Sequence, residues 1–202
     1  MNRRTFLSAS LTSTAVSAPL LGKDRDPKTG GNAKSGKKLA WQNGKSYWPI
    51  CLDTATLDKG IGLEDKLRLA AQAGFDCVEP WDRELDQYEK QGGNLKDIKS
   101  LVADLGLYIP SVIGLWNSMD ASEESFKTRL DEHRNRLRMV SAIGSRKVQV
   151  IPNMKLKDSF DHNVASWCYR QILEMAIEDY GMEGAGIVFL NFFSPLSSIA
   201  DA

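Results

Sequence analysis

The sequence predicts an α/β fold in which helices and parallel strands alternate along the chain. Four helix-like segments each end at a glycine, and a short apolar segment with the composition of a strand follows each of them. These glycines are Gly74, Gly106, Gly144 and Gly181. Glycine adopts the left-handed conformation just past a helix at little steric cost, so this position is typical of a helix C-terminus. The unit of helix, glycine and strand recurs about every 30 to 40 residues, which is the size of a βαβ step.

The individual elements are predicted from apolar periodicity. Strands are expected at 47–54, 75–79, 108–116, 147–151 and 187–193, where short apolar runs occur. Helices are expected at 63–73, 95–105, 123–143 and 164–180, where apolar residues recur three or four positions apart. Strict alternation of this kind favours a parallel sheet covered by helices. A doubly wound sheet and a (β/α)8 barrel both satisfy the pattern, and periodicity does not choose between them.

The composition excludes several classes of partner. The chain has 202 residues, with 26 basic and 26 acidic side chains and no net charge at neutral pH. This balance provides no net field to attract nucleic acid or an anionic membrane, so we expect neither partner. No segment approaches the roughly 20 apolar residues of a membrane span, so no integral span is expected. The length suits one domain with a sizeable core.

The first 46 residues differ in composition from the rest of the chain. The segment 2–8 reads Asn-Arg-Arg-Thr-Phe-Leu-Ser, which matches the twin-arginine export pattern, and a weakly apolar run follows. We therefore expect 1–22 to be a twin-arginine signal peptide and the protein to be periplasmic or otherwise extracytoplasmic. The alternative is a basic, disordered N-terminus. Residues 23–46 lack apolar periodicity and are predicted to be a flexible linker.

The cysteines provide no metal-binding motif. Cys51, Cys77 and Cys168 lack the CxxC spacing of a zinc site. Cys51 and Cys77 fall in consecutive predicted strands, where a small buried residue is the ordinary interpretation. An export signal would also permit a disulfide between them, and this remains the less favoured alternative.

One segment of the chain resembles a known family. Residues 74–79 read Gly-Phe-Asp-Cys-Val-Glu, which is similar to the second-strand signature of the sugar phosphate isomerase/epimerase family, the xylose isomerase-like TIM barrels. The helix at 63–73 and the segment 105–111 also resemble this family. No glycine-rich phosphate-binding loop follows the first strand, which argues against a doubly wound sheet. The resemblance implies that 47–202 is the N-terminal part of a (β/α)8 TIM barrel, with about five βα units.

The same resemblance implies a reaction and a cofactor for the intact family. Its members isomerise or epimerise sugars or polyols, with a divalent metal such as Mn, Mg or Zn polarising a carbonyl while a carboxylate moves the neighbouring proton. A family metal ligand on strand five corresponds here to Val188 or Asn191, so we expect no metal site and no cofactor in this chain. Because the chain ends after the fifth predicted strand, we expect a truncated, inactive protein whose open sheet edges favour self-association. The alternative is a non-catalytic, carbohydrate-binding half-barrel.

Candidate site residues lie where the predicted strands end, since barrel enzymes place their chemistry there. Glu79, at the end of the second strand, is the candidate catalytic carboxylate. The substrate-binding candidates are Asp53, Trp116, Asn117 and Asn153. Trp116 has a flat apolar face that suits a sugar ring, although an ordinary lid over the core is the simpler interpretation. The expected partner is a small carbohydrate or polyol.

Neither histidine is assigned a role. His133 lies in a charged segment and is expected on the surface. His162 follows the fourth strand near Asp158 and Asp161, but Asp161 is expected to cap a helix rather than to bind metal. Related barrels that cleave DNA at apurinic sites build a histidine-rich zinc cluster. With 2 histidines and no net charge, this chain does not support that function.

Overall fold

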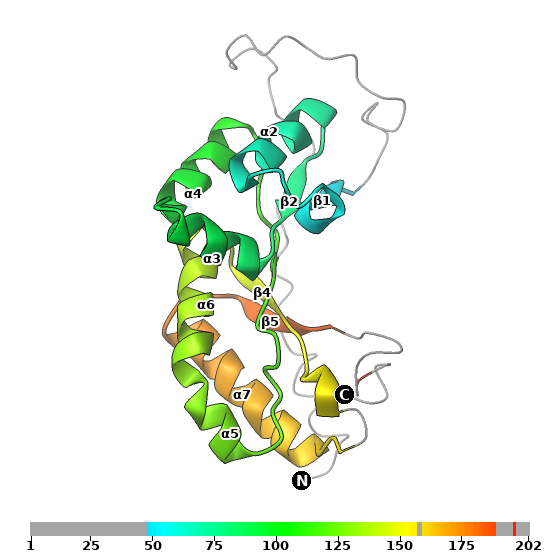
Figure 1. Cartoon of the computed structure of the whole chain (residues 1–202), viewed down its shortest axis with the longest axis vertical. Coiled ribbons are helices and arrows are strands. Elements are labelled where there is room, and N and C mark those ends of the chain that lie inside the picture. The colour runs from blue at the N-terminus through cyan, green and yellow to red at the C-terminus, as the bar shows by residue number, and fades with distance from the viewer. Residues whose placement is uncertain (1–47, 157–158, 189–195, 197–202) are drawn as a thin grey trace, which may run out of the picture. The chain divides into compact units, whose positions relative to one another are not determined.

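The computed structural model describes residues 48–156, 159–188 and 196, which all belong to one compact unit of the chain. The predicted signal peptide and linker lie outside these residues. The strands are β1 (Cys51–Asp53), β2 (Cys77–Glu79), β3 (Val112–Ile113), β4 (Lys147–Val150) and β5 (Gly184–Ile187) (Figure 1). The helices are α2 (Leu63–Ala73), α3 (Asp82–Lys90), α4 (Leu95–Asp104), α5 (Glu123–Thr128), α6 (Leu130–Ala142) and α7 (His162–Glu178). The 3-10 turns η3 (Thr54–Thr56) and η4 (Met154–Leu156) follow β1 and β4.

The order of the strands in space decides between the two candidate architectures. β1 pairs with β2, and β4 lies between β3 and β5, with every pair parallel. Isolated bridges from Cys77 to Tyr108 and from Trp81 to Ile113 connect the β2 segment to the β3 segment. The strands therefore follow one another in chain order. In a doubly wound sheet, by contrast, the order of the strands reverses part-way across the sheet. This is the order of a barrel wall, and among the described residues the wall is open.

The glycine pattern of the sequence is confirmed at the helix ends. Gly74, Gly106, Gly144 and Gly181 have φ angles of 85°, 71°, 85° and 63°. At Gly74 the glycine N–H donates to the Ala71 carbonyl at 3.1 Å, and the Phe75 N–H donates to the Ala70 carbonyl at 3.0 Å. These bonds satisfy carbonyl groups that the end of α2 would leave free, so the chain can turn directly into β2.

The structure corrects two helix predictions. The helix expected at 123–143 is divided at Arg129, whose guanidinium donates to the carbonyl groups of Asn117 at 2.7 Å and Trp116 at 3.3 Å. That long-range contact fixes Arg129 outside regular helical geometry, with φ −110° and ψ 6°. Helix α3 was not predicted, because Leu85 is its single buried apolar residue and gives no apolar stripe.

Strand boundaries also differ from the prediction. β5 begins at Gly184, earlier than the apolar run that predicted a strand at 187–193, because glycines at 184 and 186 pair with β4 without an apolar signal. Residues 189–193 lie outside the described part. The third strand is shortened at both ends to Val112–Ile113. Its C-terminal end is early because the chain leaves extended geometry at Leu115 and Asn117, where φ is 54° and 55°.

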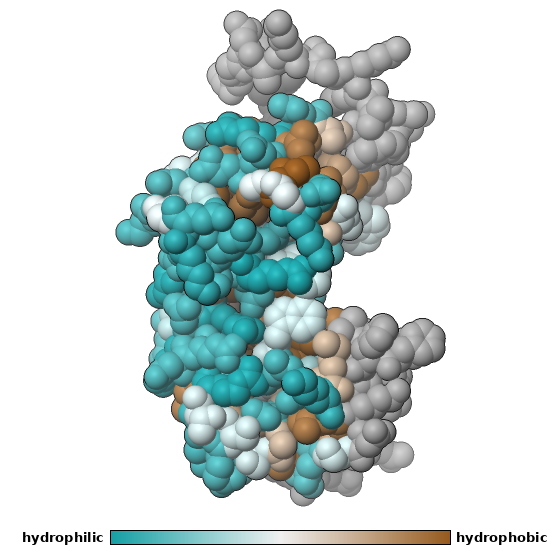
Figure 2. Space-filling view, viewed as in Figure 1, coloured by the Kyte–Doolittle hydropathy of each residue, from teal (hydrophilic) through white to brown (hydrophobic). Residues whose placement is uncertain are grey.

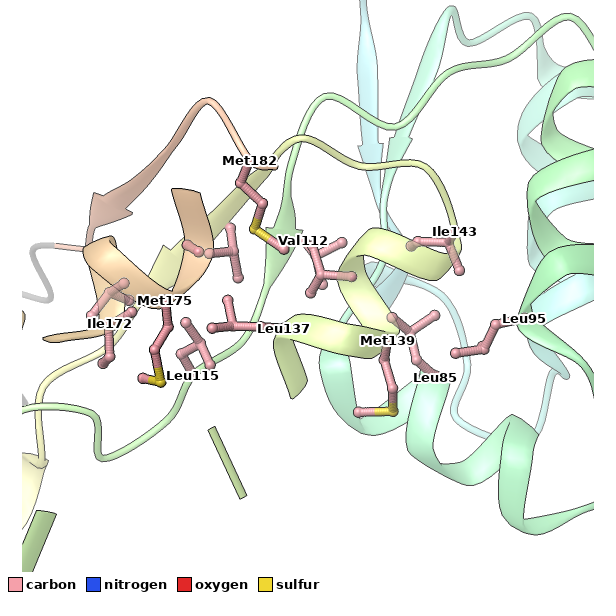
Figure 3. Packing of buried hydrophobic residues seen from close by; sticks show 14 of the residues in the cluster. Leu85, Leu95, Val112, Leu115, Leu137, Met139, Ile143, Ile172, Met175 and Met182 are labelled. Atoms are coloured by element: carbon pink, nitrogen blue, oxygen red, sulfur yellow. The ribbon is translucent and has the colours of Figure 1, made fainter. Parts of the chain in front are cut away.

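The core lies between the strands and the helices that follow them. Leu67 of α2, Leu137 of α6 and Ile172 of α7 are fully buried, as is Val78 of β2. Figure 3 shows Leu137 among other buried side chains of the strands and helices. Each such side chain contributes about 1.5 to 3 kcal/mol when it leaves water.

The helices present charged residues to solvent on their outer surface. Figure 2 shows mainly hydrophilic residues over the face formed by α3 and α6. Within the described part of the chain, no helix combines the length and the hydropathy needed to cross a membrane.

Candidate functional site

Asp53 and Glu79 occupy equivalent positions at the ends of two neighbouring strands. They are register partners between β1 and β2. Side chains alternate along a strand, so both lie on the face opposite Val78, which is fully buried beneath the helices. The structure therefore brings two of the predicted site residues together on the sheet face that the helices leave uncovered.

Glu79 is a half-buried carboxyl with a perturbed acidity. Burial raises the pKa of Glu79, and the nearby charge of Asp53 raises it further. Hydrogen bonds from Gln149 and Ser111 act in the opposite direction, and the Gln149 Nε2 lies 2.5 Å from the Glu79 Oε1. A carboxyl whose pKa is raised exchanges its proton closer to neutral pH, which is the property of a general acid or base.

Asp53 is held by a tryptophan that the sequence analysis missed. The Trp81 Nε1 donates to the Asp53 Oδ1 at 2.7 Å, and the Ala55 N–H donates to the same oxygen at 2.9 Å. Trp81 stands two residues after Glu79, so the strand alternation that places Glu79 on this face was the signal for Trp81 as well.

Trp81 and Trp116 form an aromatic pair beside the carboxylates. Their ring centroids are 5.4 Å apart with an interplanar angle of 26°, and the Arg83 guanidinium lies 4.1 Å from the Trp81 centroid. The turn that carries Trp116 is fixed by Arg129, as described above. Trp116 thus contacts Trp81. Among the described residues, no ring contact or hydrogen bond joins Trp116 to Glu79.

The two predicted asparagines have local roles. The Asn117 carbonyl accepts from Arg129, and the Asn153 Oδ1 accepts from the Lys155 N–H at 3.1 Å at the start of η4. Among the described residues, neither asparagine shares a hydrogen bond with Glu79. The structure therefore places both near the ends of their strands without joining them to the carboxylate pair.

A buried ion pair lies beneath Asp53 and Trp81. The Lys66 Nζ contacts the Glu84 Oε1 at 2.7 Å and the Thr54 carbonyl at 3.0 Å. The Glu84 Oε2 accepts from the Trp81 N–H at 3.0 Å and from the Thr54 hydroxyl. Lys66 is only 3% exposed. The signal in the sequence was a lysine on the apolar face of a helix, among Leu63, Leu67 and Ala70.

The network fixes the segments that present the candidate site. Lys66 on α2 and Glu84 on α3 join the turn after β1 to the turn after β2. Both turns carry site residues, namely Asp53 and Trp81. We therefore assign Lys66 and Glu84 a positioning role for these two side chains.

The described donors do not form a divalent metal site. No cluster of three or more His, Cys, Asp or Glu side chains that could hold a metal ion occurs among residues 48–156, 159–188 and 196. Mg²⁺ and Mn²⁺ need several oxygen ligands. Val188, one of the two positions considered for a strand-five ligand, continues the pairing of β5 through its N–H, and Asn191 lies outside the described residues.

The interpretation of Asp161 as a helix cap is confirmed. Its Oδ1 accepts from the Asn163 N–H at 2.8 Å and from the Val164 N–H at 3.3 Å, at the start of α7. His162 is exposed and its ring meets Phe160 edge-on. Asp158 lies outside the described residues.

The prediction of a surface His133 is wrong. His133 is fully buried in α6, and its ring stacks on Phe126 with the ring centroids 5.2 Å apart. Within the part of the chain that the structure describes, neither ring nitrogen has a hydrogen-bond partner. Burial, followed by the charge of Arg129, lowers the pKa of His133 to about 4. His133 shares the inward face of α6 with Leu137 and Val140, while the charged residues beside it in sequence point outward.

A groove between α3 and α6 borders this site, because Trp116 is among its lining residues. Its volume is about 560 Å³, and its lining includes Asp82, Glu132 and Arg136. The Arg136 guanidinium lies 3.1 Å from Asp82 and also contacts Glu132, so these charges are already matched. We place the candidate site at Glu79 because the carboxyl ends of barrel strands meet there.

Solved structures resemble this arrangement. The zinc-bound IolI protein aligns with a TM-score of 0.64 and 16% identity over 76% of this chain and 56% of its own. A xylose isomerase domain protein from Alicyclobacillus acidocaldarius aligns at 0.56 and 22% identity, over 76% and 56%. The chain shares the fold of the xylose isomerase-like TIM barrels. The fold predicted from residues 74–79 is thereby confirmed.

A third similar solved structure is that of a protein whose name gives a sugar reaction. The 3-keto-D-glucoside 4-epimerase YcjR from E. coli aligns with a TM-score of 0.57 and 17% identity, over 76% of this chain and 61% of its own. This chain therefore spans little more than half the length of these three proteins. No protein-family model matches the sequence, and no curated protein matches it.

Proposed function

We propose that this chain, contrary to the inactive protein expected from its sequence, binds a small sugar or polyol at the carboxyl ends of β1 and β2 and acts as an isomerase or epimerase. The observation that carries the proposal is Glu79, a half-buried carboxyl of raised pKa at the end of a barrel strand. Active sites of TIM barrels lie at this end of the strands. The name of the E. coli epimerase supports a sugar as the class of substrate.

Each of the described side chains has a separate role in such a reaction. Glu79 removes a proton from the carbon next to a carbonyl and returns it, either to the same carbon or to its neighbour. Gln149 and Ser111 hold the carboxyl in place. Asp53 accepts hydrogen bonds from substrate hydroxyls, and the partly exposed Trp116, which stacks on Trp81, offers a flat apolar surface to the sugar ring.

A sugar-binding protein without catalysis is the second candidate. The pair of stacked tryptophans beside Asp53 favours it, because this arrangement needs no proton transfer to hold a sugar. The two candidates share the binding surface and differ only in the role of Glu79. A measurement of proton exchange therefore separates them.

The test is exchange of ketose protons with solvent deuterium, followed by NMR with the full chain. We expect exchange at the carbon next to the carbonyl, with a rate that rises with pH through the raised pKa of Glu79, because the ionised carboxylate is the base. Glu79→Gln should lower the rate by about 100-fold or more, since it removes the base. Sugar binding, measured by tryptophan fluorescence, should persist.

Glu178→Gln provides the matched control, because Glu178 is an exposed carboxyl at the end of α7. It should change neither the exchange rate nor the binding. Binding without exchange in the unmodified chain would favour the non-catalytic candidate. Absence of both, across a panel of ketoses and polyols, would refute the proposed function.

A further inference from the structure

Cys51 and Cys77 face each other across two neighbouring strands. They are register partners between β1 and β2, two residues before Asp53 and Glu79. The two thiols therefore lie on the same face of the sheet as the candidate site, directly below its carboxylates.

This placement meets the main geometric requirement of a disulfide. Neighbouring strands are about 4.8 Å apart, and disulfides span Cα separations of about 4.4 to 6.8 Å. Because the two residues are register partners, their side chains leave the sheet on the same face, side by side. A bond between the sulfurs thus requires rotation of the side chains and little movement of the strands.

We propose that Cys51 and Cys77 form a reversible disulfide that links β1 to β2 beneath the candidate site. Cys51 is exposed, so it can react first, while Cys77 is only 2% exposed and completes the bond. Cys168 is fully buried in α7 and takes no part. The ordinary interpretation of both cysteines as buried core residues is wrong for Cys51.

The oxidant is a small-molecule disulfide. The Cys51 thiolate attacks one sulfur of the reagent, forms a mixed disulfide and releases one reagent thiolate. The Cys77 thiolate then attacks the Cys51 Sγ, and the second reagent thiolate leaves. The two cysteine protons end on the two released thiolates. One reagent disulfide is thus reduced to two thiols, and the two cysteines lose two electrons.

The surroundings of the pair control the rate of this exchange. Burial of part of the side chain raises the pKa of the Cys51 thiol, and the charges of Asp53 and Glu79 add to the effect. On the other side, Tyr108 hydrogen-bonds the Cys77 side chain. Because the thiolate is the attacking species, the reaction should accelerate as pH rises.

The bond would restrain the strand that carries Asp53. Among the described strands, β1 pairs only with β2, so it has a single row of backbone hydrogen bonds to hold it. A covalent link at Cys51 adds a second restraint two residues from Asp53. Oxidation would therefore stabilise the paired arrangement of Asp53 and Glu79.

The test is incubation of the full chain with oxidised glutathione, followed by counting of free thiols in denaturant and by peptide mapping without reduction. We expect the free thiols to fall from three to one per chain, with a Cys51–Cys77 linked peptide, and to return with dithiothreitol. The urea midpoint of unfolding should shift upward in the oxidised protein. Mapping of the unmodified chain keeps the test valid where a variant fails to fold.

Matched variants assign the bond. Cys168→Ala should fall from two free thiols to none, because it keeps the reacting pair. Cys51→Ser keeps the thiols of Cys77 and Cys168. We expect no internal disulfide in this variant, because one member of the reacting pair is missing. A stable glutathione adduct on Cys51, a link to Cys168, or disulfide-linked dimers as the main product would each overturn the proposal.

Discussion

Two buried polar groups in this protein have opposite surroundings. Lys66 contacts the carboxylate of Glu84 and the Thr54 carbonyl, and Glu84 is in turn bound by Trp81 and Thr54. His133 is equally buried, but among the described residues neither of its ring nitrogens has a hydrogen-bond partner. One site buries charges that partners compensate, and the other buries a titratable ring that remains neutral.

The difference shows two ways to tolerate a polar group in a core. A buried charge needs a partner in good geometry, so the Lys66 network restrains the turns that carry Asp53 and Trp81. A buried histidine without partners avoids the cost of a charge by giving up its proton, and its pKa falls. The first arrangement makes stability depend on both partners, and the second makes it depend on pH.

Breaking the Lys66 network should have the largest effect. Lys66→Met leaves the Glu84 carboxylate buried without its counter-charge, and we expect a loss of about 3 to 5 kcal/mol in the free energy of unfolding. Urea denaturation measures this loss. The double variant Lys66→Met with Glu84→Leu should recover a large part of it, because no charge is then left unpaired. A single variant as stable as the unmodified chain would contradict the role of the network.

Acid should act through His133 with the next largest effect. The ordinary pKa of histidine is 6.5, and the folded chain lowers it to about 4. Between these values the unfolded chain binds more protons than the folded one. Stability is therefore fully present above pH 6.5 and decreases toward pH 4, by about 3 kcal/mol in total.

His133→Phe isolates this contribution, because it keeps a ring that can stack on Phe126 and removes the proton site. Urea denaturation of both proteins between pH 7 and pH 4 measures the difference. The variant should lose less stability than the unmodified chain over this range. Equal pH dependence in the two proteins would show that His133 is not the responsible group.

An exposed ion pair should have the smallest effect. Lys90 and Asp86 lie 2.6 Å apart on α3, with side chains 73% and 41% exposed. Lys90→Ala should cost about 0.5 kcal/mol or less, because water solvates both charges and side-chain entropy opposes the contact. Thermal unfolding at low and high salt measures it. A loss of stability comparable to that of Lys66→Met would mean that burial does not explain the difference between the two ion pairs.

Prediction from the sequence succeeded where the signal is local. α2 covers the predicted residues 63–73, and the predicted glycines have the left-handed conformation. Prediction failed for α3, which has a single buried apolar residue. At its N-terminus, the Trp81 N–H donates to the Glu84 carboxylate. Prediction failed again at Arg129, where a contact with a turn more than ten residues away divides one helix into two.

The sequence by itself determined the alternation of helices and strands, the helix ends at glycine and the position of Glu79 at the end of a strand. These depend on the conformational preferences of neighbouring residues and on side-chain alternation. Only the tertiary structure decided the strand order, the pairing of Asp53 with Trp81 and the burial of His133. It also joined Glu79 to Gln149, which is 70 residues away in the chain. Such contacts depend on which strands become neighbours, and this is settled by packing across the sheet rather than by local sequence.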